Sequence, residues 1–516
     1  MQTPVSTNMV ATSQPDAVAV GLGILERGGN AVDAAIATAI ALTVVEPCSN
    51  GIGSDAFAMV WMDGSLHGIN ASGRSPAAWP SDVYHDRERM PILGWDAVTV
   101  PGAVSGWIAL HERFGSMELS TLAEGAVRLA RDGFVVTPLT AASWARSAQR
   151  FAAFPAWGET FAPGGRTPDS GERFRCPEQA ETIERVVESR GESFYRGEIA
   201  SRIVADAERH GALLGAEDLA THAPVWCDPL SSRWGEHELH ELPPNGQGLV
   251  ALVAAGILER LGYAAEGPFD PRALHLQIEA MKCAFSDIKA VVGDPDCMTV
   301  EPEELLSPDH LDAHARRIRI DRASDPGHVV VSDASTVYLS CADASGGMVS
   351  FIQSNYMGFG SGVVIPGTGI AMQNRGAGFV LTEGHPNRAG GGKRPYHTII
   401  PGFVTRDGRP ECSFGVMGGH MQPQGHVQVL WRMFELGMDP QDALDAPRWR
   451  IAEGRRVHLE PGFPPETVQA LEQLGHSIEI AEDRTVAFGG GQVVRRTDGG
   501  WIGGSDPRRD GCVGGR

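Results

Sequence analysis

The first hundred residues alternate between apolar stretches long enough for helices and shorter runs typical of strands. The spacing predicts a helix over about 15–27 and a second apolar helix, capped by Asn30, that runs through Val45. A buried strand is predicted over 56–61, and the Asp63-Gly64 pair predicts a tight turn after it. This order of elements indicates a layered fold of mixed helix and sheet.

The middle of the chain has a largely helical pattern. Apolar positions at helical spacing recur in four regions, at residues 102–136, 178–210, 248–261 and 271–291. Because one apolar face of each helix must be covered, we expect these helices to flank a sheet.

The last third of the chain is dominated by β patterns. Residues 336–342 and 348–354 predict one hairpin, and residues 398–404 and 412–417 predict another. We expect the two hairpins to belong to one sheet. The preceding residues 302–333 are charged and contain few apolar positions, so they are expected to be an accessible lead-in to the first of these strands.

Composition excludes several classes of partner. With 516 residues and 42% hydrophobic side chains, the chain can bury a large core, but its net charge of −21 opposes binding to nucleic acid or to an anionic membrane. The longest apolar stretch, residues 34–45, is too short to span a bilayer, and the first residues lack the pattern of a signal peptide. We therefore expect a cytoplasmic protein.

The motif content argues against cofactors and against two common enzyme classes. The eight cysteines form no CxxC pair and no His-rich ligand cluster, so a zinc site is not expected. No cofactor is expected either. There is no GxSxG elbow of an α/β-hydrolase, and neither GxGxxG nor GxxxxGK[ST] of a nucleotide-binding protein occurs.

The junction between Ser335 and Thr336 carries the candidate chemistry. If the chain cleaves itself there, Thr336 becomes an N-terminal residue whose α-amine, with an intrinsic pKa of about 8, can accept the proton of its own hydroxyl. One residue then supplies both nucleophile and base. The alternative is an ordinary strand threonine, since threonine is common in strands.

A glycine pair could stabilise the oxyanion that an acyl transfer forms. Gly418 and Gly419 follow the apolar run 414–417, and their backbone N–H groups can approach a substrate with no Cβ in the way. The same pair is also compatible with a simple turn between a strand and the helix predicted over 424–436, and both interpretations can hold together.

Several motifs together resemble those of the γ-glutamyltransferases, N-terminal nucleophile (Ntn) hydrolases made as one precursor. The resemblance runs nearly from end to end and is carried by residues 27–35 (RGGNAVDAA), 129–134 (LARDGF), 393–395 (KRP) and 505–511 (SDPRRDG). It implies an α+β fold, the four-layer αββα Ntn sandwich. It also implies a large subunit of residues 1–335 and a small catalytic subunit of residues 336–516, which remain associated after cleavage.

The resemblance also assigns roles to individual residues. Thr336 falls at the nucleophile, Ser354 at the position whose hydroxyl supports it, and Gly418 and Gly419 at the oxyanion hole. Arg74 falls at the arginine that holds the substrate α-carboxylate. From sequence alone, Ser354 is equally well explained as a solvated strand serine, and an arbitrary arginine is more often a surface charge.

This chain departs from the family pattern around the substrate. Gly378 takes the place of the acid that binds the glutamyl α-ammonium, Arg375 replaces a neutral amide, and His397-Thr398 replace paired serines, while Val337 follows the nucleophile in place of a second threonine. The pocket has thus lost a negative charge and gained a positive one, and an α-ammonium buried without its carboxylate partner is costly. We therefore expect Arg375, His397 and Thr398 to bind a small carboxylate-bearing amide without the amino group, such as a glutaryl amide or oxamate.

Two other functions stay open at this point. The first is a true γ-glutamyltransferase or glutathione hydrolase, and the second is an unprocessed homologue that serves as a binding or structural module. Hydrolysis is favoured over transfer, although the sequence does not separate them. It does not reveal the oligomeric state either, and a homodimer is one option.

Overall fold

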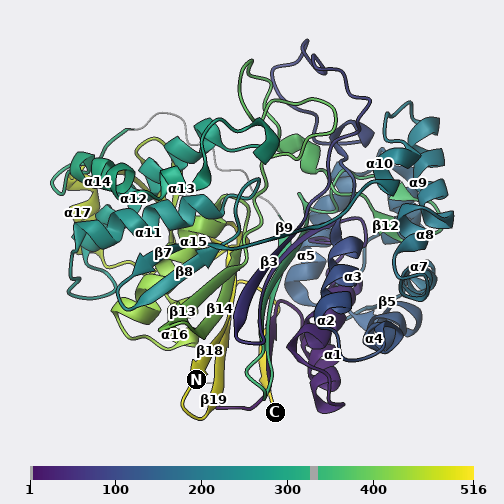
Figure 1. Cartoon of the computed structure of the whole chain (residues 1–516), viewed down its shortest axis with the longest axis horizontal. Helices are drawn as coiled ribbons and strands as arrows, with labels where there is room; N and C mark the ends of the chain where they lie inside the picture. The colour runs from purple at the N-terminus through teal and green to yellow at the C-terminus, as the bar shows by residue number, and fades with distance from the viewer. Residues whose placement is uncertain (1–3, 326–334) are drawn as a thin grey trace.

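Two antiparallel sheets lie face to face between two layers of helices (Figure 1). The computed structural model describes residues 4–325 and 335–516. The seven-stranded sheet has the order β20 (Cys512–Gly515), β1 (Met9–Thr12), β9 (Ser335–Ala342), β10 (Met348–Tyr356), β2 (Asp55–Met62), β3 (Ser65–Ala71) and β6 (Val225–Cys227). The six-stranded sheet has the order β19 (Gly500–Ser505), β18 (Gly490–Thr497), β14 (Arg409–Met417), β13 (Gly402–Arg406), β8 (His237–Glu241) and β7 (Leu230–Trp234).

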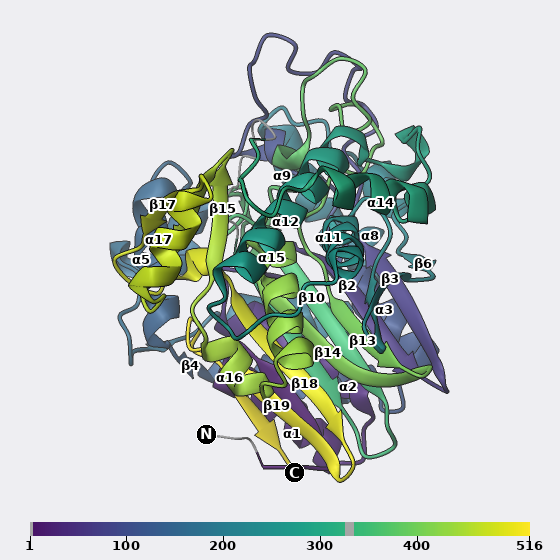
Figure 2. The ribbon, with the colours of Figure 1, turned by 90° about the vertical axis from the view of Figure 1, so that its left-hand side faces the viewer.

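The helices divide between the outer faces of the two sheets. One side holds α1 (Pro15–Glu26), α2 (Ala31–Val45), α3 (Ala103–Phe114), α4 (Leu119–Asp132), α5 (Pro138–Arg150), α6 (Pro155–Phe161), α7 (Pro177–Glu188), α8 (Glu192–Tyr195), α9 (Glu198–Arg209) and α10 (Ala216–Ala220). Across the six-stranded sheet lie α11 (Gly248–Leu261), α12 (Pro271–Val291) and α15 (Met421–Leu430), as Figure 2 shows. This arrangement is the expected four-layer αββα sandwich.

Shorter elements complete the chain. They are α13 (Pro302–Leu305), α14 (Pro308–Arg317), α16 (Pro440–Asp445), α17 (Pro465–Gln473), the pairs β4 (Phe134–Val135) with β5 (Arg173–Phe174) and β11 (Val364–Ile365) with β12 (Ile370–Ala371), and the small sheet of β15 (Trp449–Glu453), β16 (Arg456–Leu459) and β17 (Ser477–Ile480). No helix within the described ranges is long and apolar enough to cross a membrane.

Strand β9 is buried on both of its faces because it lies near the centre of the sandwich. Side chains alternate along a strand, so Val337 and Leu339 pack in the core under the helices, whereas Tyr338 packs in the core between the sheets. Burial on both faces fixes the register of β9, because a shift by one residue would exchange the two sets of side chains.

The two predicted hairpins form, but the prediction that they share a sheet is wrong. The β9–β10 hairpin belongs to the seven-stranded sheet and the β13–β14 hairpin to the six-stranded sheet. The hairpins face each other across the interior, where Tyr338 and Ile352 pack with Phe403 and Met417. Apolar residues on both faces of each strand make this stacking favourable, since a second sheet must cover the inner face.

The expected lead-in to β9 is only partly accessible. Residues 302–317 form α13 and α14, and they bury Leu305 and Leu311 against the core beside α11 and α12. Residues 326–333 of the predicted lead-in lie outside the described part of the chain.

Candidate active site

Thr336 is buried opposite an irregularity in strand β10. Gln353 pairs with Val337 and Tyr356 pairs with Ser335, so two residues of β10, Ser354 and Asn355, oppose Thr336 alone. Such a β-bulge redirects the side chains of the bulged strand. As a result the Thr336 hydroxyl lies 3.2 Å from the Ser354 hydroxyl and donates a hydrogen bond to it.

Ser354 links the candidate nucleophile to the candidate scissile carbonyl. Its hydroxyl donates to the backbone carbonyl oxygen of Ser335 over 2.8 Å while it accepts from Thr336 and from the Tyr356 N–H. A donor on the Ser335 oxygen is placed to stabilise negative charge that develops there when the carbonyl is attacked. The predicted support of Thr336 by Ser354 thus has a direct geometric basis.

A buried arginine lies next to this pair. The Arg375 guanidinium donates to Thr398 Oγ1 at 2.8 Å and to Ser354 Oγ at 3.3 Å, and it lies over the Tyr356 ring, 4.2 Å from its centre. Burial lowers the pKa of Arg375 to about 10, so the side chain stays cationic at neutral pH. No carboxylate of the described residues lies within ion-pair distance of it, and its Nε donates no hydrogen bond.

His397 contacts an acid that the sequence prediction missed. Its Nε2 lies 3.1 Å from Asp55 Oδ2, and its Nδ1 accepts from the Ile399 N–H, so Nε2 carries the proton in this arrangement. Burial raises the pKa of Asp55 to about 7, although Arg375 opposes the rise, and burial lowers the pKa of His397 well below its usual value. An aspartate that opens the otherwise apolar strand β2 was the available clue.

The glycine pair presents free backbone donors. Gly418 and Gly419 have φ angles of 124° and 61°, which favour glycine, and both lie buried between β14 and α15. Within the described residues, neither backbone N–H has a hydrogen-bond acceptor, whereas the Gly419 carbonyl accepts from Gln247 Nε2 at 2.8 Å. Two buried, unused N–H groups are what an oxyanion hole requires.

Arg74 makes all its contacts elsewhere in the structure. Its Nη1 donates to Asp294 and to the Gly392 carbonyl, at 2.9 and 2.8 Å, and its Nη2 lies 3.2 Å from Asp296. The guanidinium of Arg74 thus already donates to protein acceptors. No hydrogen bond joins Arg74 to Thr336, Ser354 or Arg375. Its assignment as a carboxylate clamp stays a prediction.

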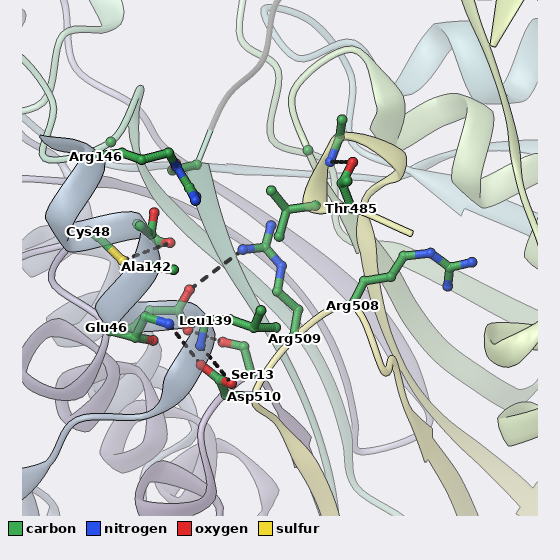
Figure 3. A pocket seen from close by; sticks show the side chains of 18 of the residues that line it. Ser13, Glu46, Cys48, Leu139, Ala142, Arg146, Thr485, Arg508, Arg509 and Asp510 are labelled. Carbon is green, nitrogen blue, oxygen red and sulfur yellow. Dashed lines mark hydrogen bonds and ion pairs between the residues drawn. The ribbon is translucent and has the colours of Figure 1, made fainter. Parts of the chain in front are cut away.

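A cavity of about 480 Å³ begins at the candidate scissile bond. Ser335 and Gly418 are among its lining residues, and so are residues of α5 and of the segment that follows β19. Figure 3 shows Arg146 and Arg509 on opposite sides of the cavity, with Glu46 and Asp510 at its base. This volume is in the range of small-molecule binding sites.

Two other clusters contain potential metal ligands. His275, Glu279 and His476 form one group, and Asp287, His310 and His314 form the other. Each is closed by internal hydrogen bonds, such as the 2.8 Å contact between the rings of His275 and His476 and the two histidine contacts of Asp287. Neither group shares a residue with the Thr336 site or with the cavity.

Replacing Ser354 with alanine is expected to slow self-cleavage before Thr336 by about 10- to 100-fold, because the donor to the Ser335 oxygen is lost. The rate is measured on denaturing gels with freshly translated chain. Ser350→Ala is the matched control, since Ser350 lies on the same strand but bonds to the Tyr338 hydroxyl at 2.7 Å. Equal rates for both variants would contradict this role of Ser354.

The chain belongs to the γ-glutamyltranspeptidase family, whose family model matches residues 17–515. It is 34% identical to the glutathione hydrolase-like YwrD proenzyme of Bacillus subtilis, over 98% of each chain, and 34% identical to the oxamate amidohydrolase proenzyme of Klebsiella pneumoniae, over 96% of each. The solved structure of cephalosporin acylase from Bacillus halodurans superimposes with a TM-score of 0.95 at 47% identity, covering 99% of this chain and 96% of that one.

These findings confirm the family resemblance and the Ntn hydrolase fold. The protein is therefore an enzyme of this family, an amide hydrolase or acyltransferase. The interpretation as a non-enzymatic module is not supported.

Proposed function

We propose that the chain cleaves itself between Ser335 and Thr336, and that the new N-terminal Thr336 hydrolyses small amides whose acyl group carries a carboxylate and no α-ammonium. Of the three relatives named above, the oxamate amidohydrolase supports this class of substrate, because oxamate has a carboxylate beside its amide carbonyl and no ammonium group. Two of them are named as proenzymes, which supports self-cleavage.

One nucleophile serves both reactions in this proposal. In the precursor, the Thr336 Oγ attacks the Ser335 carbonyl carbon, the C–N bond breaks as the ester forms, and the hydroxyl proton ends on the freed amine. Water then hydrolyses the ester, leaving a carboxylate on Ser335. In turnover, the same hydroxyl attacks the substrate amide with the Thr336 amine as base, the substrate amine leaves with the proton, and water resolves the acyl-enzyme.

The strand order supports stable association of the two fragments, residues 1–335 and 336–516. Strand β1 lies between β20 and β9, and β2 pairs with β10, so strands from both fragments alternate within one sheet. Separating the fragments would break these ladders and expose the core between the sheets. The proposed catalytic unit is thus the cleaved, undissociated pair.

The single observation that carries the substrate proposal is the buried Arg375. Its guanidinium is removed from water and has no carboxylate at ion-pair distance in the described part of the chain, so an anion that binds beside it would stabilise it. Because Arg375 donates to Ser354, such an anion would lie close to the nucleophile, as an acyl carboxylate of a short substrate does. Gly378 offers no side chain to an ammonium group.

Comparing kcat/KM for glutaryl and γ-glutamyl p-nitroanilides tests the proposed substrate class, since the two differ only by the α-amino group. The glutaryl compound is expected to be preferred by at least about tenfold, because the α-ammonium would lie near a cation with no acid at position 378. A clear preference for the γ-glutamyl compound would show that the chain is a glutathione hydrolase of the ordinary kind.

A further inference from the structure

The cavity beside Ser335 is cationic in a chain with a large excess of acids. Five arginines and two acids are among its lining residues, whereas the whole sequence has 64 acidic and 43 basic residues. In the described part of the chain, only Arg508 of the five arginines is paired with acids outside the cavity, Glu460 and Asp506. A concave site lined by one sign of charge concentrates ligands of the opposite sign. The cavity is thus suited to an anion.

Both acids of the cavity are already engaged by the protein. Asp510 accepts from the Thr137 hydroxyl and from the N–H groups of Leu139 and Thr140 at the start of α5. Glu46 accepts from the Ser13 hydroxyl, and burial raises the pKa of its carboxyl group, although Arg509 opposes the rise. Glu46 still lies 4.0 Å from Arg509, whereas neither carboxylate is within ion-pair distance of Arg146.

Two arginines face each other across the cavity, and both have hydrogen-bond donors that no protein group accepts within the described residues. Figure 3 shows the guanidinium groups of Arg146, from α5, and Arg509 pointing toward one another across the cavity. Within the described residues Arg146 has no ion-pair or hydrogen-bond partner, and Arg509 has only Glu46 at 4.0 Å and an unused, buried Nε. Two facing cations repel each other, and an anion bound between them would relieve that repulsion.

The position of the cavity relative to the buried Arg375 indicates whether it binds the acyl half or the amine half of the substrate. Arg375, His397 and Thr398 are fully buried, so an acyl group held by them is shielded while it is attached to Thr336. The cavity instead leads outward from Ser335 and Gly418 to the exposed Arg146 and Arg484. A leaving amine must exchange with water by an open route of this kind.

We propose that this cavity binds the amine half of the substrate, and that Arg146 and Arg509 hold a carboxylate on that half. The proposal rests on the proposed amidase function and extends it. The substrate class becomes amides with an anionic group on each side of the scissile bond, the acyl carboxylate toward Arg375 and the amine carboxylate toward Arg146.

Two synthetic amides test the charge on the amine half separately from the charge on the acyl half. Glutaryl-p-aminobenzoate and glutaryl-p-aminobenzamide share the acyl group and differ only in the charge on the amine half. In Arg146→Gln, the ratio of kcat/KM for the benzoate over the benzamide is expected to fall about 10- to 30-fold relative to the unsubstituted enzyme, the loss of one charge-assisted contact. Arg128→Gln on α4, an exposed arginine outside the cavity, is the matched control and should leave the ratio unchanged.

Calorimetric binding of free p-aminobenzoate, the product of the first amide, gives a readout independent of turnover. Binding that is lost in Arg146→Gln supports the subsite even if neither amide is hydrolysed, an outcome that would overturn the proposed function alone. Turnover of both amides with an unchanged ratio in Arg146→Gln would overturn the subsite and leave the function standing. Absence of both turnover and p-aminobenzoate binding would overturn both.

Discussion

Replacing Thr336 with alanine is expected to leave the chain as a single uncut polypeptide and to reduce amidase activity by more than about 10⁴-fold. Both reactions lose their only proposed nucleophile, and removal of a catalytic nucleophile typically has an effect of this size. A denaturing gel and a glutaryl anilide assay measure the two effects on one preparation.

Two matched variants show that the effect belongs to the Thr336 hydroxyl. Thr336→Ser keeps a hydroxyl and should still be cut and active, with altered rates because serine lacks the β-methyl that restricts the rotamer. Ser335→Ala removes the neighbouring hydroxyl and should be cut normally. Efficient cleavage of Thr336→Ala, or failure of Ser335→Ala to cleave, would place the nucleophile elsewhere.

Replacing Arg375 with glutamine is expected to lower kcat/KM for a glutaryl anilide by about 30- to 1,000-fold. The substitution restores the neutral amide of the family pattern and removes a desolvated cation from the proposed acyl site. The expected loss corresponds to about 2 to 4 kcal/mol, within the range found when one partner of a buried charge pair is removed. Rates are expressed per mole of cleaved protein, because Arg375 also contacts Ser354 and a slower self-cleavage must be separated from slower turnover.

The charge of the substrate provides the control for Arg375. Pentanoyl anilide has the same chain length without the carboxylate, so Arg375→Gln should affect it much less than the glutaryl compound. Arg375→Lys keeps the charge but loses the planar fork, and an intermediate activity is expected. Equal losses for the charged and the neutral substrate would assign Arg375 a structural role and remove the main support for an anionic acyl group.

The helices were the most predictable part of the fold because the residues that begin and end a helix lie next to it in the sequence. Asn30 caps α2 with hydrogen bonds to the N–H groups of Val32 and Asp33, as its position before an apolar run predicts. The helices predicted over 248–261 and 271–291 form with those bounds.

The pairing of strands that are distant in sequence was less predictable, since an apolar run predicts a buried strand but does not indicate which strand pairs with it. Local sequence patterns could not predict that β1 lies beside β9, which is more than 300 residues away in sequence. They could not predict either that the two hairpins belong to separate sheets.

The same distinction applies to the site. Sequence reasoning found Thr336, Ser354, Arg375 and Thr398, which the structure brings into one hydrogen-bonded group. It did not predict the bulge that makes the contact between Thr336 and Ser354, nor the pairing of Asp55 with His397, because both depend on how β10 meets its neighbours. Arg146 and Arg509 were also missed, since arginines so far apart in sequence become a pair only through the fold.

The proposed cleavage makes Thr336 the N-terminal residue of a catalytic fragment. Mass spectrometry and N-terminal sequencing of the purified, active protein detect this terminus. We expect two associated fragments, residues 1–335 and 336–516, the second beginning Thr-Val-Tyr-Leu. Active protein that consists only of the uncut chain, or whose second fragment begins at another residue, would contradict the proposed cleavage.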